Sequence, residues 1–192
     1  MDFIIDIIFQ MIPAIILITF CVFVLISAIT REEYIENTVF LILFSALYLT
    51  AIVFNLLSFF IFTSNLIFTI LDWVFTGILV LVFIFFVVYA IMNREYFGIF
   101  LFIGGLLLLL GFIVDIAFYY TIRLLLIMTS IPTSVINIIG FSTQIIETII
   151  IITASIFLIL HGQKQEDKFM LTAGILRIIH VGWLFLIGFL II

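Results

Sequence analysis

Long apolar runs constrain the fold of this chain more than any other feature of its sequence. Six such runs cover residues 3–29, 38–62, 66–92, 97–120, 139–160 and 169–192. A transmembrane helix needs about 20 mostly apolar residues. The runs also lack the alternation of polar and apolar residues that membrane β-strands show. The sequence therefore predicts an all-α fold, a polytopic transmembrane helix bundle.

The composition excludes several other classes of protein. The chain is 68% hydrophobic and 9% charged, whereas a soluble domain is roughly 45–50% apolar and about 25% charged. Disorder requires low hydrophobicity and high charge, so it is excluded as well. Six Lys and Arg residues against eleven Asp and Glu give a net charge of -5 without a basic patch, and nucleic-acid binding has no electrostatic support.

Motifs for metals, cofactors and catalysis are missing from the sequence. The single cysteine, Cys21, lies inside an apolar run, and the two histidines, His161 and His180, are not a close pair. Zinc, iron–sulfur and bis-histidine haem sites are therefore not expected. The sequence contains no Gly-rich phosphate loop, no G-x-S-x-G and no H-E-x-x-H. We expect no cofactor, no metal and no catalytic residue, and a protein that is not an enzyme.

The breaks between the runs are too short to separate two domains, so residues 1–192 are predicted to form one integral membrane domain. The chain begins with acidic residues at Asp2 and Asp6, whereas a signal peptide begins with basic ones. The first run is therefore interpreted as the first membrane helix. The abundance of Ile and Phe and the low Lys content favour a plasma membrane.

Residues 121–138 are ambiguous, because Pro132 and several Ser, Thr and Asn residues interrupt a stretch of only about 18 residues. The segment is interpreted as re-entrant, as interfacial, or as a poor seventh span. Six spans with the N-terminus outside would leave only Arg123 outside and place four basic residues in the cytoplasm, namely Arg31, Arg94, Lys164 and Lys168. A seventh span would place two inside and three outside, so the positive-inside rule favours six.

A duplicated helical hairpin is one interpretation of the middle of the chain. Residues 40–60 align with residues 100–120, and this places Asn55 opposite Asp115. The helices that follow place Asp72 opposite Glu147. Chance identity is the alternative, because Leu, Ile and Phe make up most of both segments.

Ionisable residues inside the predicted spans are the candidate functional residues, because a charge in a membrane is costly and faces protein or water. The candidate ion- or ligand-binding residues are Asp72, Asp115, Glu147, Arg177 and His180. The three acids lie roughly 30, 26 and 20 Å from the cytoplasmic helix ends, and Arg177 and His180 roughly 10 and 15 Å. Each shares a helix face with small or polar residues, as Asp115 does with Gly104 and Gly111.

Two hypotheses account for these residues. In the first, the acids Asp72, Asp115 and Glu147 line a pocket that opens outward, and Arg177 and His180 lie below it as counter-charges or as part of a proton path. Glu147 and Arg177 are then the expected pair. In the second, the residues act separately: two acids reach the outer interface, Arg177 extends toward the cytoplasm, and Glu147 is protonated. Residues 163–168 are predicted to be a solvated turn.

Three functions remain compatible with the sequence. The first is a non-catalytic subunit or helper of a larger membrane assembly or homo-oligomer, because the loops are short and several helix faces are rich in Gly and Ser. Its partners would be the lipid bilayer and other membrane proteins or a second copy of itself. The second is a small cation- or proton-coupled transporter or channel with an outward-facing acidic pocket. The third is a membrane-embedded module that senses a ligand through that pocket.

Overall fold

The computed structural model describes residues 2–30, 35–61, 65–93, 99–128 and 132–191. Side chains are described for residues 11–30, 38–54, 74–93, 99–118, 120–121, 132, 134–136 and 138–186. Within these ranges the chain forms six α-helices and no strand: α1 (Asp2–Thr30), α2 (Ile35–Ile61), α3 (Asn65–Met92), α5 (Ile99–Met128), α6 (Thr133–Lys164) and α7 (Lys168–Ile191). The all-α prediction is confirmed.

Five of the helices are long and apolar enough to cross a membrane. The described stretches that meet this criterion are Met11–Thr30, Val74–Met92, Ile99–Phe118, Ser134–Lys164 and Lys168–Leu186. In α2 the described apolar stretch is shorter, Thr38–Phe54. The chain therefore has the architecture and surface of a membrane-type helix bundle.

The segment 121–138 is divided between two helices, which differs from the separate piece that the sequence indicated. Residues 121–128 continue α5, and residues 133–138 open α6. Thr121 is accommodated within α5, because its hydroxyl donates a hydrogen bond to the Ala117 carbonyl of its own helix, at 2.6 Å. Pro132 precedes α6 with φ -59° and ψ 137°, an extended conformation suited to the residue before a helix.

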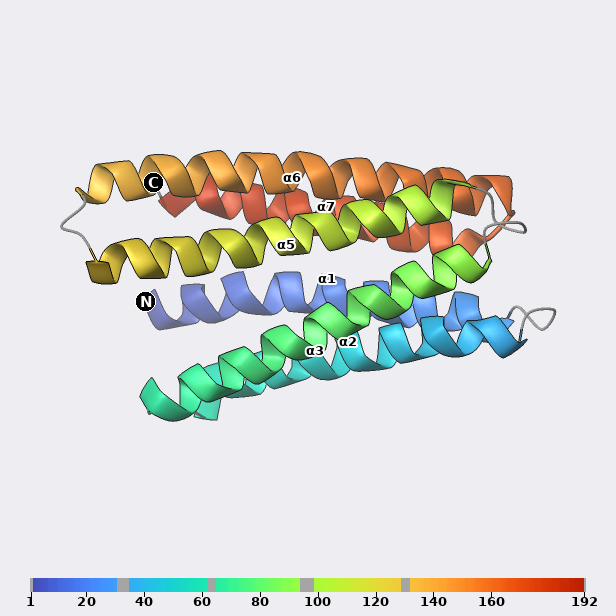
Figure 1. The fold of residues 1–192 in the computed structure, drawn as a ribbon, viewed down its shortest axis with the longest axis horizontal. Coiled ribbons are helices and arrows are strands. Elements are labelled where there is room, and N and C mark those ends of the chain that lie inside the picture. Colours follow the sequence, from blue (N-terminus) through green and yellow to red (C-terminus); the bar gives the residue numbers. More distant parts are fainter. Residues whose placement is uncertain (1, 31–34, 62–64, 94–98, 129–131, 192) are drawn as a thin grey trace.

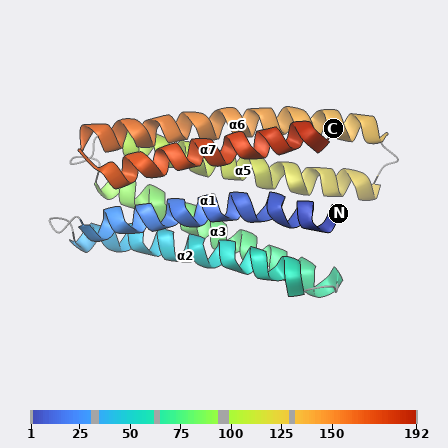
Figure 2. The same ribbon diagram turned by 180° about the vertical axis from the view of Figure 1, so that it is seen from behind.

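The helices form a closed ring in which chain neighbours pack side by side. Each helix packs on the next one along the chain, and α7 returns to pack on α1. The start of α1 and the end of α7 lie together at one end of the bundle, which we call the terminal end (Figure 1). At the opposite end, the three-turn end, α1 leads to α2, α3 to α5, and α6 to α7 (Figures 1 and 2).

Glycines set the close packing of α5, α6 and α7. A Cβ at Gly104 would lie 3.3 Å from the Ala154 carbonyl oxygen, and one at Gly174 would lie 3.0 Å from the Ser155 carbonyl oxygen. At Gly162 a Cβ would lie only 2.5 Å from the backbone nitrogen of Leu171. Backbones approach this closely only where one of them has no side chain.

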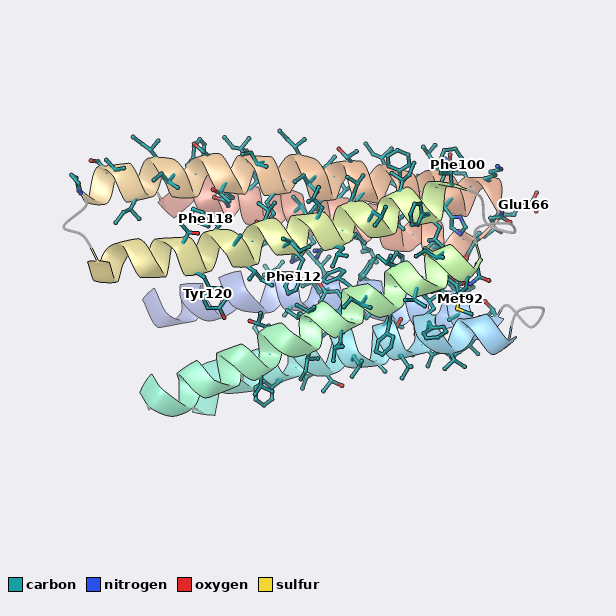
Figure 3. All side chains as sticks on the ribbon, in the orientation of Figure 1. Met92, Phe100, Phe112, Phe118, Tyr120 and Glu166 are labelled. Carbon is teal, nitrogen blue, oxygen red and sulfur yellow. The ribbon has the colours of Figure 1, made fainter. Side chains whose placement is uncertain are left out.

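An aromatic cluster fills the bundle between α1, α2, α3 and α5. The ring centroids of Phe44 and Phe86 are 4.8 Å apart, and those of Tyr48 and Phe83 are 5.8 Å apart. Phe83 in turn lies 5.0 Å from Phe112, whose side chain extends from α5 into the bundle (Figure 3). Tilted and edge-on ring pairs of this kind stabilise a core beyond the apolar area they bury.

Burial is concentrated toward the three-turn end. Fully buried residues occur along this half of every helix, for example Val24, Leu41, Phe86, Leu101, Leu158 and Ala173. Among the side chains described in 74–81, 112–121 and 132–150, none is buried. The α2–α3 pair also diverges from α5, α6 and α7 toward the terminal end (Figures 1 and 2). The bundle is therefore tightly packed in one half and loosely packed in the other.

The turn between α6 and α7 is more ordered than a solvated turn, and that prediction is wrong for Asp167. Asp167 is buried, and its Oδ2 accepts a 2.6 Å hydrogen bond from the Ser27 hydroxyl on α1. Its Oδ1 accepts hydrogen bonds from the backbone nitrogens of Phe169 and Met170, both at 3.0 Å. Asp167 thus caps α7 and joins it to α1, because the first backbone N–H groups of a helix need acceptors.

Candidate functional site

Arg177 and His180 are buried in α7 and touch each other. A nitrogen of the Arg177 guanidinium, Nη1, lies 3.2 Å from His180 Nδ1. Arginine has only donors and stays protonated, so it must donate and His180 Nδ1 must accept. The ring proton of His180 is therefore on Nε2. The remaining N–H groups of Arg177 and the Nε2–H of His180 are consequently hydrogen-bond donors.

Asp115 and Glu147 lie opposite each other on α5 and α6. A Cβ at Gly111 would lie 3.2 Å from Ile151 Cγ1, so these residues are level. The two helices are antiparallel, and Asp115 comes four residues after Gly111 while Glu147 comes four residues before Ile151. Asp115 and Glu147 therefore lie at the same height along the bundle, one helical turn from the Gly111–Ile151 contact toward the terminal end. They also interact electrostatically.

The environment of the two acids differs from that of the basic pair. Asp115 is exposed and Glu147 is half-buried, whereas Arg177 and His180 are 8% and 5% exposed. The acids lie about 24 and 26 Å along their helices from the three-turn end, and Arg177 lies about 14 Å along α7. The acids therefore lie in the loosely packed half, and the basic pair lies at the edge of the packed half.

The expected pairing of Glu147 with Arg177 is not found among the described side chains, where no ion pair joins the two. Gly174 packs against Ser155 and Ile159, so Arg177 is level with residues about two turns from Glu147. That separation is roughly 10 Å along the bundle. The guanidinium is still close enough to Glu147 to interact with it electrostatically.

Tyr48 belongs to this group of residues, and the sequence reasoning missed it. It is buried on α2, and its side chain interacts with the Arg177 guanidinium. Ser45 lies three residues earlier and is also buried, so the two share one face of α2. Two polar residues on one face of an apolar run were a signal of an interior polar position.

Asp72 lies on α3, and its side chain is outside the described part of the chain, as is that of Asn55. The structure thus forms two pairs from four of the five candidate residues, Asp115 with Glu147 and Arg177 with His180, roughly 10 Å apart along the bundle, and it leaves Asp72 untested. In the described part of the chain, no group of three or more His, Cys, Asp or Glu side chains is placed to hold a metal ion.

The arrangement supports two kinds of chemistry. Two carboxylates side by side repel each other, and a shared proton or a cation between them relieves that repulsion. The basic pair, Arg177 and His180, can hold a hydrogen-bond acceptor or an anion.

No family model, curated protein or solved structure matches the chain.

Proposed function

We propose that this chain is a small cation- or proton-coupled transporter or channel, with Asp115 and Glu147 as the site that takes the cation or proton. The observation that supports the proposal is the juxtaposition of these two acids in the loosely packed half of the bundle. Placing an ionisable group inside a membrane helix has a high free-energy cost, and such groups often mark ion pathways. Arg177 and His180 lie at the inner limit of this pathway and control how far a cation can enter.

The proposal includes six spans with the N-terminus outside the cell. α2 is the sixth span, because it is 27 residues long, about 40 Å, and packs between α1 and α3. The helix ends beside Arg31, Arg94, Lys164 and Lys168 all belong to the three-turn end. That end is then cytoplasmic by the positive-inside rule, and the acids face outward. The membrane we propose is the plasma membrane.

Flux through reconstituted protein tests the proposal. The purified chain is placed in liposomes, and proton and sodium entry are followed with fluorescent indicators under an imposed gradient. Asp115→Asn combined with Glu147→Gln should reduce the flux at least tenfold, because the pathway loses both of its carboxylates.

Glu166→Gln is the matched control, since it removes a carboxylate from the exposed turn between α6 and α7 (Figure 3). It should leave the flux unchanged. A flux that survives loss of both acids, or no flux above that of empty liposomes, would contradict the proposal.

A second candidate function, a subunit of a larger assembly or homo-oligomer, has one specific observation in its favour. Asp115 is exposed on the surface of the single chain although it lies far along a membrane helix. A partner covering it would remove the cost of placing it against lipid. The glycine-rich faces no longer favour this function, because Gly104, Gly111, Gly162 and Gly174 pack within the chain.

Native mass spectrometry after mild-detergent extraction separates the two candidates. A defined complex that Asp115→Leu preserves would support the subunit function, whereas a monomer would favour the transporter. A ligand-sensing role for the same residues is a third proposal, and saturable ligand binding without flux would support it.

A further inference from the structure

Arg177 carries a permanent positive charge in a nearly dry part of the bundle. Its side chain is 8% exposed and begins about 14 Å along α7 from Lys168. No carboxylate among the described side chains forms an ion pair with it, and its side-chain contacts are with His180 and Tyr48. These contacts are with neutral groups, and a buried charge without an opposite charge beside it is unfavourable, so an anion beside the guanidinium would stabilise it.

The groups around Arg177 are suited to an anion. His180 already uses Nδ1 as acceptor for the guanidinium, so its free nitrogen is a donor. Tyr48 adds a hydroxyl from α2 next to the guanidinium. Glu147, which interacts electrostatically with Arg177, lies on the loosely packed side, roughly 10 Å from Arg177 along the bundle.

Arg177 and His180 lie close to the end of the buried part of α7. Among the described side chains of α7, His180 and Val181 are the last buried ones, and none of those in 182–186 is buried. The two donors of Arg177 and His180 therefore lie where the packed half of the bundle meets the loosely packed half. A lipid headgroup would have to leave the surface and enter the bundle to reach them.

We infer that Arg177, His180 and Tyr48 form a binding site for a small monovalent anion, either a halide or the carboxylate of a small organic acid. Guanidinium and imidazole N–H groups recognise both kinds of anion through charge-assisted hydrogen bonds. The site goes beyond the proposed function, because it does not require Asp115 or Glu147 to carry a cation.

Thermal unfolding of the detergent-purified full chain tests the site. Sodium chloride, and separately sodium acetate, replaces sodium gluconate at constant ionic strength, so that only the anion changes. A ligand that binds the folded state raises the unfolding temperature in a saturable way. We expect saturation with chloride or acetate, and Arg177→Gln should raise the half-saturating concentration at least tenfold.

His180→Phe and Arg177→Lys are the further variants, and they replace Arg177→Gln if that variant does not fold. Both should weaken binding, because one removes a donor and the other replaces the planar guanidinium fork with a single ammonium. Lys168→Gln removes an exposed cation from the same helix and should bind like the unmodified chain.

Saturation with chloride would identify an inorganic anion, and saturation with acetate alone would identify a carboxylate. The inference is overturned if neither anion gives saturation, or if the Arg177 and His180 variants saturate like the unmodified chain. Its failure is distinct from failure of the proposed transport, because flux that depends on Asp115 and Glu147 can be present without any anion effect.

Discussion

Asp167 joins two helices, α1 and α7, with one carboxylate. It accepts a hydrogen bond from Ser27 of α1 and caps the first turn of α7 through two backbone nitrogens. All of this occurs in a buried place beside the α6–α7 turn. A hydrogen bond to a charged acceptor is stronger than one between neutral groups, and losing one partner leaves the other unsatisfied.

Ser27→Ala should therefore lower the free energy of unfolding by about 1.5–3 kcal/mol. Thr30→Ala is the matched control, because the Thr30 hydroxyl bonds only to carbonyls of its own helix and is exposed. It should change stability by less than about 0.5 kcal/mol. Reversible unfolding in mixed micelles measures both, and equal effects would show that the Ser27–Asp167 bond adds no stability.

Asp167 and Arg177 illustrate why only part of the site could be predicted from the sequence. Asp167 precedes an apolar run, and this position is typical of a helix cap, but the neighbouring Gln, Lys and Glu residues made a solvated turn the simpler interpretation. The contact of Arg177 with His180 follows from their spacing of three residues on one helix. The contact of Arg177 with Tyr48 does not, because it depends on which helices pack together.

Among the helices, the α6–α7 hairpin has the least room for change. A Cβ at Gly162 would lie 2.5 Å from the Leu171 backbone nitrogen, and one at Gly174 would lie 2.7 Å from Ile159 Cγ1. At Gly182 of α7, nothing lies within 4 Å. The hairpin therefore offers two crowded glycines and an uncrowded one for comparison.

Gly162→Ala should cost about 1–3 kcal/mol, as overpacking does, because the neighbouring atom belongs to the backbone and cannot rotate away. Gly182→Ala should be neutral or stabilising, since alanine favours a helix over glycine by about 1 kcal/mol. The unfolding free energies of the two variants test this difference. A Gly162→Ala protein as stable as Gly182→Ala would contradict the close packing of α6 on α7.

The helices themselves were predictable, but their ends were less so. The expected runs 97–120 and 139–160 correspond to α5 and α6, which extend to Met128 and begin at Thr133. Thr121 is the first polar residue beyond the predicted end of α5, and its hydroxyl bonds to a carbonyl four residues earlier in its own helix, so it is accommodated without ending the helix. The hydroxyls of Ser142 and Thr143 make the same bond inside the predicted part of α6.

The whole molecule is polarised along its axis, with a packed half and a loose half. This property was hidden from the sequence, because apolar residues are equally common in both halves and only the packing distinguishes them. The aromatic cluster and the glycine contacts hold the packed half together. The acids lie in the loose half and the basic pair lies at the edge of the packed half. The sequence predicts the acids as a group from their depth, but their neighbours depend on which helices pack together.

Six spans predict opposite sides for the two ends of α6. Ser134→Cys and Gln163→Cys place thiols on exposed positions near the start and end of that helix, and the natural Cys21 is buried. In intact cells a membrane-impermeant maleimide should label position 134, and it should label position 163 only after permeabilisation. Labelling of both positions from the same side would exclude the proposed topology.

In the proposed transporter Asp115 faces water between the helices, although it lies far along a membrane helix. Labelling of Asp115→Cys with an impermeant thiosulfonate in intact cells tests this position. Ile113→Cys is the control, because it is 49% exposed at nearly the same depth but points to the opposite side of α5. We predict rapid labelling at 115 and little at 113, since thiols react as thiolates and lipid suppresses ionisation. Equal labelling of both, or of neither, would contradict a water-filled path to the acids.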